Sequence, residues 1–101
     1  MPVVHVVLLK AIATESAVLH ALESLRQLVS IIPGLESFEC GKYSSPEGIN
    51  RGYTWCFTML FADVSARDGY LVHPLHIAAA ANVVAVCDGG INGVLAFDYE
   101  K

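Results

Sequence analysis

The chain has 101 residues, of which 54% are hydrophobic and 16% are charged, and its formal net charge is −4. Because a charged share of about 25% is usual, this chain carries more apolar material than one small core needs, and we expect a partner subunit and an apolar ligand cavity to take up the surplus. The six Lys and Arg residues form no basic patch and no apolar run reaches the ~20 residues of a membrane span, so neither nucleic acid nor a membrane is an expected partner.

The cysteines and the start of the chain are typical of a cytoplasmic protein. Cys40, Cys56 and Cys87 are odd in number and have neither zinc-ligand nor CxxC spacing. Their apolar surroundings predict that they behave as small core residues. The opening sequence lacks the basic region of a signal peptide. We therefore expect a reducing, cytoplasmic location and a single domain over residues 1–101.

A strand and a helix are predicted in the first third of the chain. Residues 3–9 are β-branched and apolar with no turn residue, which is typical of a strand, and His5 and Val7 share one of its faces. We expect Thr14 to cap a helix whose apolar residues recur at helical spacing as far as residue 32. A Pro-Gly pair at positions 33–34 then ends that helix.

Two further strands are predicted in the middle of the chain. Residues 35–43 indicate a strand, and residues 44–52 form a polar loop. The clearest strand is 53–62, where bulky and smaller side chains alternate. This alternation predicts one face packed on helices and another facing a second sheet or a cavity. Packing alone explains the bulky stripe, so it does not by itself indicate a cofactor site.

Two helices and a last strand are predicted in the remaining part. Ser65 can cap a short helix over residues 66–72. A longer helix, 75–87, begins after a proline and contains no charged residue, so we expect it to be buried on most sides. Residues 91–99 indicate the last strand, after a Gly pair that breaks the helix.

The predicted elements give a ferredoxin-like β-α-β-β-α-β order in the α+β class, with the second crossover split at a proline. Helices then cover one face of a four-stranded sheet. The other face carries apolar residues, and nothing within the chain is left to cover it. Face-to-face association of two copies would cover this face, so we expect a homodimeric α/β barrel.

One short segment concentrates the side chains that can perform chemistry. Tyr70, His73 and His76 fall within seven residues, and His5 lies in the first apolar strand. His and Tyr move protons near neutral pH without a cofactor. His73 directly precedes Pro74, which forces its backbone to be extended, so we expect His73 to be structural. For His76 and His5 the alternative is a structural role, with each ring hydrogen-bonded to nearby groups.

Metal and cofactor chemistry find less support in the sequence. His73 and His76 are three residues apart, but the intervening proline restricts their geometry and no carboxylate completes a ligand set, so no metal is expected. No glycine-rich phosphate-binding loop follows a strand, and no nucleophile elbow is present. We expect no cofactor.

Several segments together match one known family: His5-Val6-Val7-Leu8-Leu9-Lys10, Ile32-Pro33-Gly34, Gly41 with Ser45 and Glu47, Gly52-Tyr53-Thr54, Tyr70-x-x-His73-Pro74-x-His76 and Phe97-Asp98-Tyr99. On these residues the chain resembles the dimeric α/β-barrel stress-responsive family, whose members include olivetolic acid cyclase and a plant boiling-stable stress protein. The resemblance covers essentially the whole chain and implies a homodimer in which two sheets form a barrel. It departs from the cyclase after His76, where this chain has an isoleucine followed by four alanines.

The resemblance implies a site as well as a fold. In the cyclase, a His on the helix after the proline is the general base, and that position resembles His76. Tyr70 and His5 resemble two further active-site residues of the cyclase. We take these three as candidate catalytic residues. Candidate substrate-binding residues are the apolar side chains expected nearby: Trp55, Phe57, Phe61, Ile77 and Val7.

Three functions follow from this reading as hypotheses. The first is a cofactor-independent cyclase that promotes enolisation and intramolecular aldol closure of a poly-β-keto substrate, with a His base. The second is a non-catalytic stress-responsive homodimer that binds an apolar ligand, in which case Ile77, Trp55 and Phe61 are expected to fill the space beside His76. The third is a small-molecule isomerase or lyase of the same barrel type.

Overall fold

Four strands and three helices follow one another in the predicted order. The computed structural model describes residues 1–101. Its elements are β1 (Val3–Leu9), α1 (Glu15–Arg26), β2 (Leu35–Lys42), β3 (Trp55–Phe61), α2 (Val64–Leu71), α3 (Pro74–Ala85) and β4 (Val94–Glu100), with short 3-10 helices at Gln27–Ser30 and Gly90–Gly93. The strands form one antiparallel sheet in the order β2-β3-β1-β4. The predicted ferredoxin-like α+β fold is therefore confirmed.

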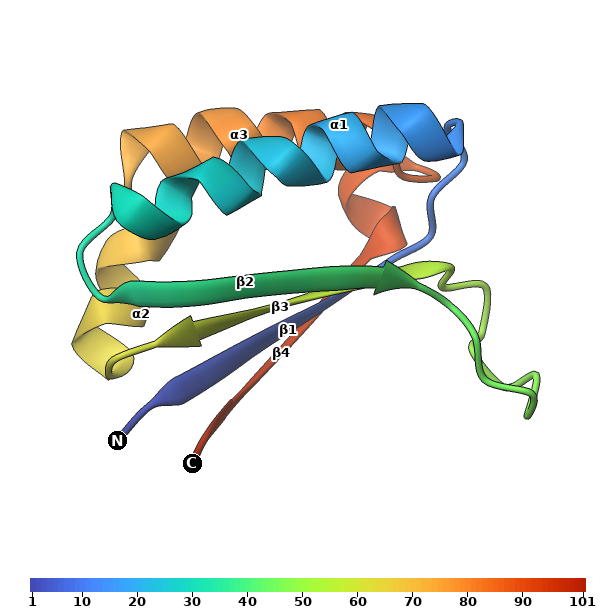
Figure 1. Ribbon diagram of the computed structural model, residues 1–101. Coiled ribbons are helices and arrows are strands. Elements are labelled where there is room, and N and C mark those ends of the chain that lie inside the picture. The colour runs from blue at the N-terminus through green and yellow to red at the C-terminus, as the bar shows by residue number, and fades with distance from the viewer.

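The helices cover one face of the sheet and leave the other bare. Figure 1 shows α1 and α3 lying across the same face, with α2 at the end of the sheet where β3 finishes. The predicted alternation is confirmed, because β1 and β3 both bury every second residue. The buried residues of β1 and β3 meet α1 in a core whose largest fully buried side chains include Phe61, Leu9, Leu22, Leu25 and Met59. Burial of each such side chain contributes roughly 1.5–3 kcal/mol.

The first helix begins as predicted and ends earlier. The Thr14 hydroxyl accepts a hydrogen bond from the backbone N–H of Ala17 at 3.2 Å, which confirms the cap. The α-helix ends at Arg26, and the chain continues as the 3-10 helix Gln27–Ser30 rather than as an α-helix to residue 32. This tighter turn still buries Leu28 and Ile32 against the core.

The cap predicted for the second helix is wrong. Asp63, not Ser65, caps α2, and its carboxylate accepts from the backbone N–H of Ala66 at 2.8 Å. Asp63 follows β3 closely in an extended conformation, which places its side chain three residues before a free N–H. Ser65 already lies inside the first turn.

The prediction that the third helix is buried on most sides is wrong for the single chain. Only Ala79 and Val83 of α3 are buried, and Ile77 is 59% exposed. The run of alanines accounts for part of this difference, because methyl side chains leave little apolar area in water, but Leu75 and Ile77 are large and exposed as well. His73 caps α3 and Pro74 occupies its first turn, so the structural role predicted for His73 is confirmed.

The sheet face opposite the helices is apolar and uncovered. β4 contributes Leu95, Phe97 and Tyr99, all of them exposed, and β1 contributes half-buried Val4 and Val6 beside them. No helix in the structure has both the length and the apolar character needed to cross a membrane. This uncovered face leaves several large apolar side chains in water.

Candidate active site

An apolar cavity of about 270 Å³ lies between α3 and the helix-covered face of the sheet. Eleven of its thirteen lining residues are hydrophobic. The lining residues are His5, Val7, Leu25, Phe57, Tyr70, Leu71, His76, Ala80, Val83, Val84, Ile91, Val94 and Ala96. The lining is therefore apolar apart from the side chains of His5, His76 and Tyr70.

The structure brings His5, Tyr70 and His76 together at this cavity. The ring of Tyr70 lies against that of His76, with 4.0 Å between the ring centroids and 38° between the planes. The ring of His5 meets Tyr70 edge-on at 6.1 Å. The proline-split crossover produces this cluster, because it puts Tyr70 near the end of α2 and His76 in the first turn of α3.

His76 has one ring nitrogen occupied and the other free. Its Nδ1 lies 3.2 Å from the backbone carbonyl oxygen of Leu71, and a carbonyl can only accept, so Nδ1 carries the hydrogen. Nε2 is then the unprotonated nitrogen, and it has no partner in the protein. Burial lowers the pKa of His76 below its ordinary value, and the nearby rings of His5 and His73 lower it further, against the opposing effect of the Leu71 hydrogen bond. The neutral ring is a base at neutral pH.

Tyr70 is a fully buried phenol whose hydroxyl has no hydrogen-bond partner. Burial raises the pKa of Tyr70 well above its ordinary value of 10, so the hydroxyl keeps its proton. A buried, unpaired hydroxyl costs roughly 1–3 kcal/mol. The Tyr70 oxygen is sealed from a water-sized molecule, so the phenol or its neighbours must shift before a ligand oxygen can accept this hydrogen bond. Tyr70 is thus a donor without an acceptor.

His5 is held by a partner that the sequence analysis did not single out. Its Nδ1 lies 2.6 Å from a carboxylate oxygen of Asp98, which faces it across the β1–β4 pair. A second carboxylate oxygen of Asp98 accepts from Arg67 at 2.8 Å. Two features of the sequence could have indicated Asp98. It belongs to the Phe97-Asp98-Tyr99 segment, and strand alternation places it on the face of β4 that the helices cover. Nothing in the local sequence indicated Arg67.

The five candidate substrate-binding residues divide into two groups. Val7 and Phe57 line the cavity. Phe61 lies behind Tyr70, with 5.0 Å between ring centroids, and it supports the cluster without facing the cavity. Trp55 is buried at the opposite end of β3, and Ile77 points outward because the next residue along a helix turns by about 100° from His76. None of these three side chains fills the space beside His76.

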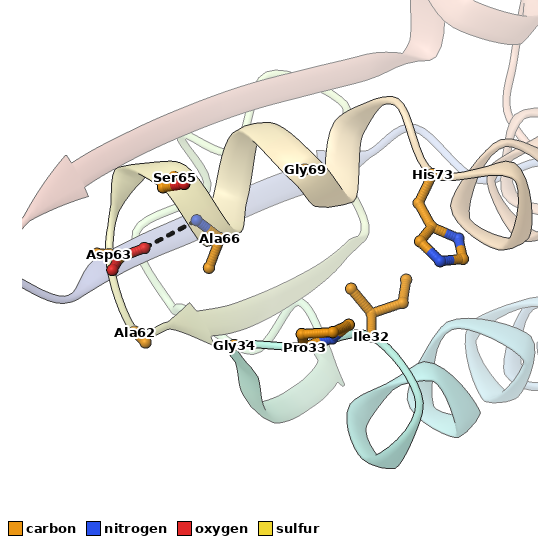
Figure 2. Close-up of a pocket in the computed structure, with 9 residues that line it drawn as sticks. All are labelled: Ile32, Pro33, Gly34, Ala62, Asp63, Ser65, Ala66, Gly69 and His73. Atoms are coloured by element: carbon orange, nitrogen blue, oxygen red, sulfur yellow. Dashed lines mark hydrogen bonds between the residues drawn. The ribbon is translucent and has the colours of Figure 1, made fainter.

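In a larger hollow elsewhere on the surface, the two titratable side chains are engaged in capping helices. The hollow measures about 410 Å³ and lies between the Ile32–Gly34 turn and the start of α2. Figure 2 shows its two titratable side chains, Asp63 and His73, on opposite sides. Asp63 already caps α2, and the Nδ1 of His73 accepts from the backbone N–H of Leu75 at 3.1 Å. Both groups are engaged in holding helix ends. Nowhere in the chain are three or more His, Cys, Asp or Glu side chains grouped as a metal site requires.

Comparison with known proteins gives a consistent result. The family model described as the stress responsive A/B barrel domain matches residues 3–101. The stress-response A/B barrel domain-containing protein HS1 of Arabidopsis thaliana is 30% identical over 101 residues, covering 98% of this chain and 89% of that protein. A dimeric ferredoxin-like protein of unknown function from Jannaschia is 31% identical, with a TM-score of 0.90 and full coverage of both chains. The hydroxynitrile lyase of Passiflora edulis shares the fold, with a TM-score of 0.84, 17% identity and coverage of 97% of this chain and 91% of that one.

Proposed function

This chain belongs to the stress-responsive A/B barrel domain family, and from that premise we propose that its cavity is the active site of a cofactor-independent cyclase. The enzyme promotes enolisation and intramolecular aldol closure of a short poly-β-keto substrate. The observation that supports this most directly is the Tyr70–His76 pair. The two rings lie against each other at an apolar cavity, where Nε2 of His76 has no partner and the buried Tyr70 hydroxyl has none either.

The first step is removal of a proton from carbon. A C–H bond between two carbonyl groups is already acidic, and Nε2 of His76 takes its proton. The electron pair of that bond becomes an enolate, whose oxygen accepts a hydrogen bond from the Tyr70 hydroxyl. Because the hydroxyl has no other partner, this contact is gained at the moment when negative charge appears on the oxygen.

The second step closes the ring. The enolate carbon attacks a carbonyl carbon further along the same chain, and the electron pair of that carbonyl moves to its oxygen. His5, when protonated on Nε2, hydrogen-bonds this oxygen, while Asp98 stabilises the charged ring through Nδ1. The proton held by His76 returns to the new alkoxide, so the base is regenerated. Loss of one water then gives the cyclic product.

The cavity sets the size of the substrate. A volume of about 270 Å³ falls just under the 300–1,000 Å³ that is usual for small-molecule sites. At ~30 Å³ for each water it holds on the order of nine water molecules. We therefore expect a short substrate, of roughly ten non-hydrogen atoms inside the cavity, rather than a long alkyl chain.

We infer that two copies of the chain associate through the uncovered sheet face. That face presents Leu95, Phe97 and Tyr99 to water, and nothing within the chain covers them. The Jannaschia structure with 31% identity is described as dimeric. Association through these faces removes the apolar surface from water and leaves both helix-side cavities open.

A turnover assay tests the cyclase proposal. The purified protein is incubated with a short trioxoalkanoyl thioester of N-acetylcysteamine, and the cyclic product is followed by mass spectrometry as loss of one water. The wild-type protein should form the product, and His76→Ala should slow it about 100-fold or more. His20→Ala, which removes an exposed imidazole on α1, is the matched control and should leave turnover unchanged.

Two outcomes of this assay would favour one of the alternative functions instead. Binding of the thioester without turnover favours a ligand-binding stress protein, in keeping with the name of the Arabidopsis relative. Chemistry on another small carbonyl compound, with no ring closure, favours a lyase or isomerase, in keeping with the Passiflora enzyme that shares the fold. Either outcome would refute the cyclase proposal.

A further inference from the structure

Four charged or titratable side chains contact one another in series, and the last of them, His5, lines the cavity. Arg67 on α2 contacts Asp68 through Nε and Asp98 through a terminal nitrogen, each at 2.8 Å. The other carboxylate oxygen of Asp98, on β4, lies 2.6 Å from Nδ1 of His5, on β1. Arg67 and Asp98 are both largely shielded, with 22% and 21% of their side chains exposed. The Arg67–Asp98 contact therefore differs from a solvent-exposed ion pair, which contributes little to stability.

Asp98 is held by both of its oxygens, and each oxygen has a different partner. Rotation of the carboxylate would break one contact or the other, so its orientation is determined by Arg67 and His5 together. A guanidinium is always charged in proteins, and that of Arg67 donates to one oxygen of the Asp98 carboxylate. An ionised carboxylate can only accept a hydrogen bond. Nδ1 of His5 must therefore be the donor.

The tautomer of His5 decides which nitrogen faces the substrate. With the hydrogen on Nδ1, the other nitrogen, Nε2, has no partner in the protein, and it is not sealed from a water-sized molecule. A neutral imidazole in water has two tautomers, and only the one with hydrogen on Nδ1 leaves Nε2 free to take up and release a proton. Without Arg67, one oxygen of Asp98 is unpaired and the carboxylate can turn away from His5.

We propose that Arg67 is a positioning residue, which holds one oxygen of Asp98 so that the other keeps a hydrogen on Nδ1 of His5 and leaves Nε2 as the nitrogen that exchanges protons in the cavity. The inference rests on the proposed function for its catalytic meaning, but the tautomer itself can be observed without any substrate. The other titratable groups that face His5 are the ring of Tyr70 on α2 and, through the cavity, His76 on α3. Neither contacts Nδ1, so Asp98 alone selects the tautomer.

Nitrogen-resolved NMR of the full-length protein tests this assignment. Two-bond ¹⁵N–¹H spectra distinguish the two neutral tautomers of each histidine ring. In the wild-type protein we expect the neutral His5 ring to carry its hydrogen on Nδ1 and none on Nε2. In Arg67→Met the Nε2–H tautomer should rise about tenfold, which corresponds to a loss of roughly 1.4 kcal/mol of preference.

Matched variants separate positioning from a general loss of structure. Arg26→Met removes a helix-borne arginine that also contacts a carboxylate, Glu23, and it should leave the His5 spectrum unchanged. Arg67→Lys keeps a cation beside Asp98 and should hold the tautomer ratio within about threefold of wild type. If Arg67→Met fails to fold, Arg67→Gln, which is neutral but polar, is expected to give the same tautomer shift.

The outcomes for Arg67 and for the cyclase are distinguishable. An unchanged tautomer ratio in a folded Arg67→Met protein overturns the positioning role, whatever happens to turnover. A shifted ratio, together with the absence of turnover in every protein including wild type, supports the role of Arg67 and refutes the cyclase. If both proposals hold, Arg67→Met lowers kcat about tenfold and leaves KM for the trioxoalkanoyl thioester nearly unchanged.

Discussion

Tyr70 and His76 are neighbours whose surroundings give them opposite proton-transfer roles. The same burial that raises the pKa of the phenol lowers that of the imidazole, because both effects disfavour a charged group. The phenol therefore stays a donor and the imidazole stays an acceptor at neutral pH. Pairs of titratable groups whose environments separate their protonation states are typical of acid–base sites.

Removal of the Tyr70 hydroxyl should separate stability from activity. Tyr70→Phe keeps the buried ring and deletes an oxygen that has no partner, so the free energy of unfolding should stay the same or rise by up to about 1 kcal/mol. Turnover should fall about 100-fold, since the enolate oxygen loses its donor. Urea denaturation and the ring-closure assay measure the two effects. A large loss of stability with normal turnover would mean that the hydroxyl is structural.

The lowered pKa of His76 predicts the pH dependence of the reaction. The base is active when neutral, so kcat/KM should fall on the acid side, with a midpoint below the ordinary histidine value of 6.5 for the pKa of His76. Stability follows the same group. Below pH 6.5 the unfolded chain binds the proton more readily than the folded protein does, so the free energy of unfolding falls as the pH drops from 6.5 toward the folded pKa. A pH–rate profile with its midpoint clearly above 6.5 would contradict this assignment.

At the residue scale the sequence predicted the reactive groups better than their partners. His5, Tyr70 and His76 were recognisable because proton-transfer side chains are rare in such apolar segments. Asp98 lies 93 positions from His5, and only the register of β4 on β1 brings them together. Ile77 was expected at the site because it follows His76 in the sequence, and Trp55 because it belongs to the same bulky alternation of β3 as Phe57. Strand length and helix rotation place them elsewhere.

At the scale of single elements, the turn between α1 and β2 depends on a glycine for two separate reasons. Gly34 has a φ of 81°, which non-glycine residues rarely adopt, and a Cβ at this position would overlap the side chain of Ala66 on α2. The glycine thus lets α2 pack closely against the turn that leads into β2. It also forms one wall of the open hollow in Figure 2.

Substitution of this glycine should weaken the fold. Gly34→Ala is expected to lower the free energy of unfolding by about 3 kcal/mol, through backbone strain and the overlap with Ala66 together. Gly48→Ala is the control, because Gly48 has a similar φ of 71° but no atom within reach of a new Cβ. It should lose only about 1 kcal/mol. Equal losses in the two variants, measured by urea denaturation, would show that close packing at Gly34 is unimportant.

Element boundaries were predictable where the signal is local and less so where two signals compete. The strand β1 and the Thr14 cap follow directly from β-branched runs and from capping chemistry. For α2 two capping residues stand close together, and Asp63 prevails because it alone is extended at the helix start. The exposed outer side of α3 was not predictable from hydropathy, since alanine counts as apolar but loses little by remaining in water.

At the scale of the whole molecule, the uncovered sheet face predicts how two copies associate. Phe97→Asp places a charge among exposed apolar side chains on that face. The dimer dissociation constant should rise about 100-fold or more, which analytical ultracentrifugation at micromolar concentration would detect. Ile31→Asp alters a similarly exposed apolar side chain near the end of the first helix and should leave association unchanged. A wild-type protein that is monomeric at these concentrations would refute the barrel.

The order of the elements and the antiparallel sheet could be predicted from the sequence, because apolar residues alternate clearly in the strands and recur at helical spacing in the helices. The cavity was expected only as a consequence of the apolar surplus. Its volume depends on how far α3 stands from the sheet, and the Ala78–Ala81 run does not determine that distance by itself. The sequence pattern therefore predicted the fold, whereas the volume of the cavity could be obtained only from the structure.

Deuterium uptake from solvent tests the central claim most directly, since that claim is proton removal from carbon by His76. A β-diketone of about ten non-hydrogen atoms is incubated with the protein in D₂O, and exchange of the C–H between its carbonyls is followed by NMR. Wild type should accelerate exchange at least about 100-fold over His76→Ala at equal concentration, while His20→Ala matches wild type. Equal exchange rates for wild type, His76→Ala and buffer would contradict the account.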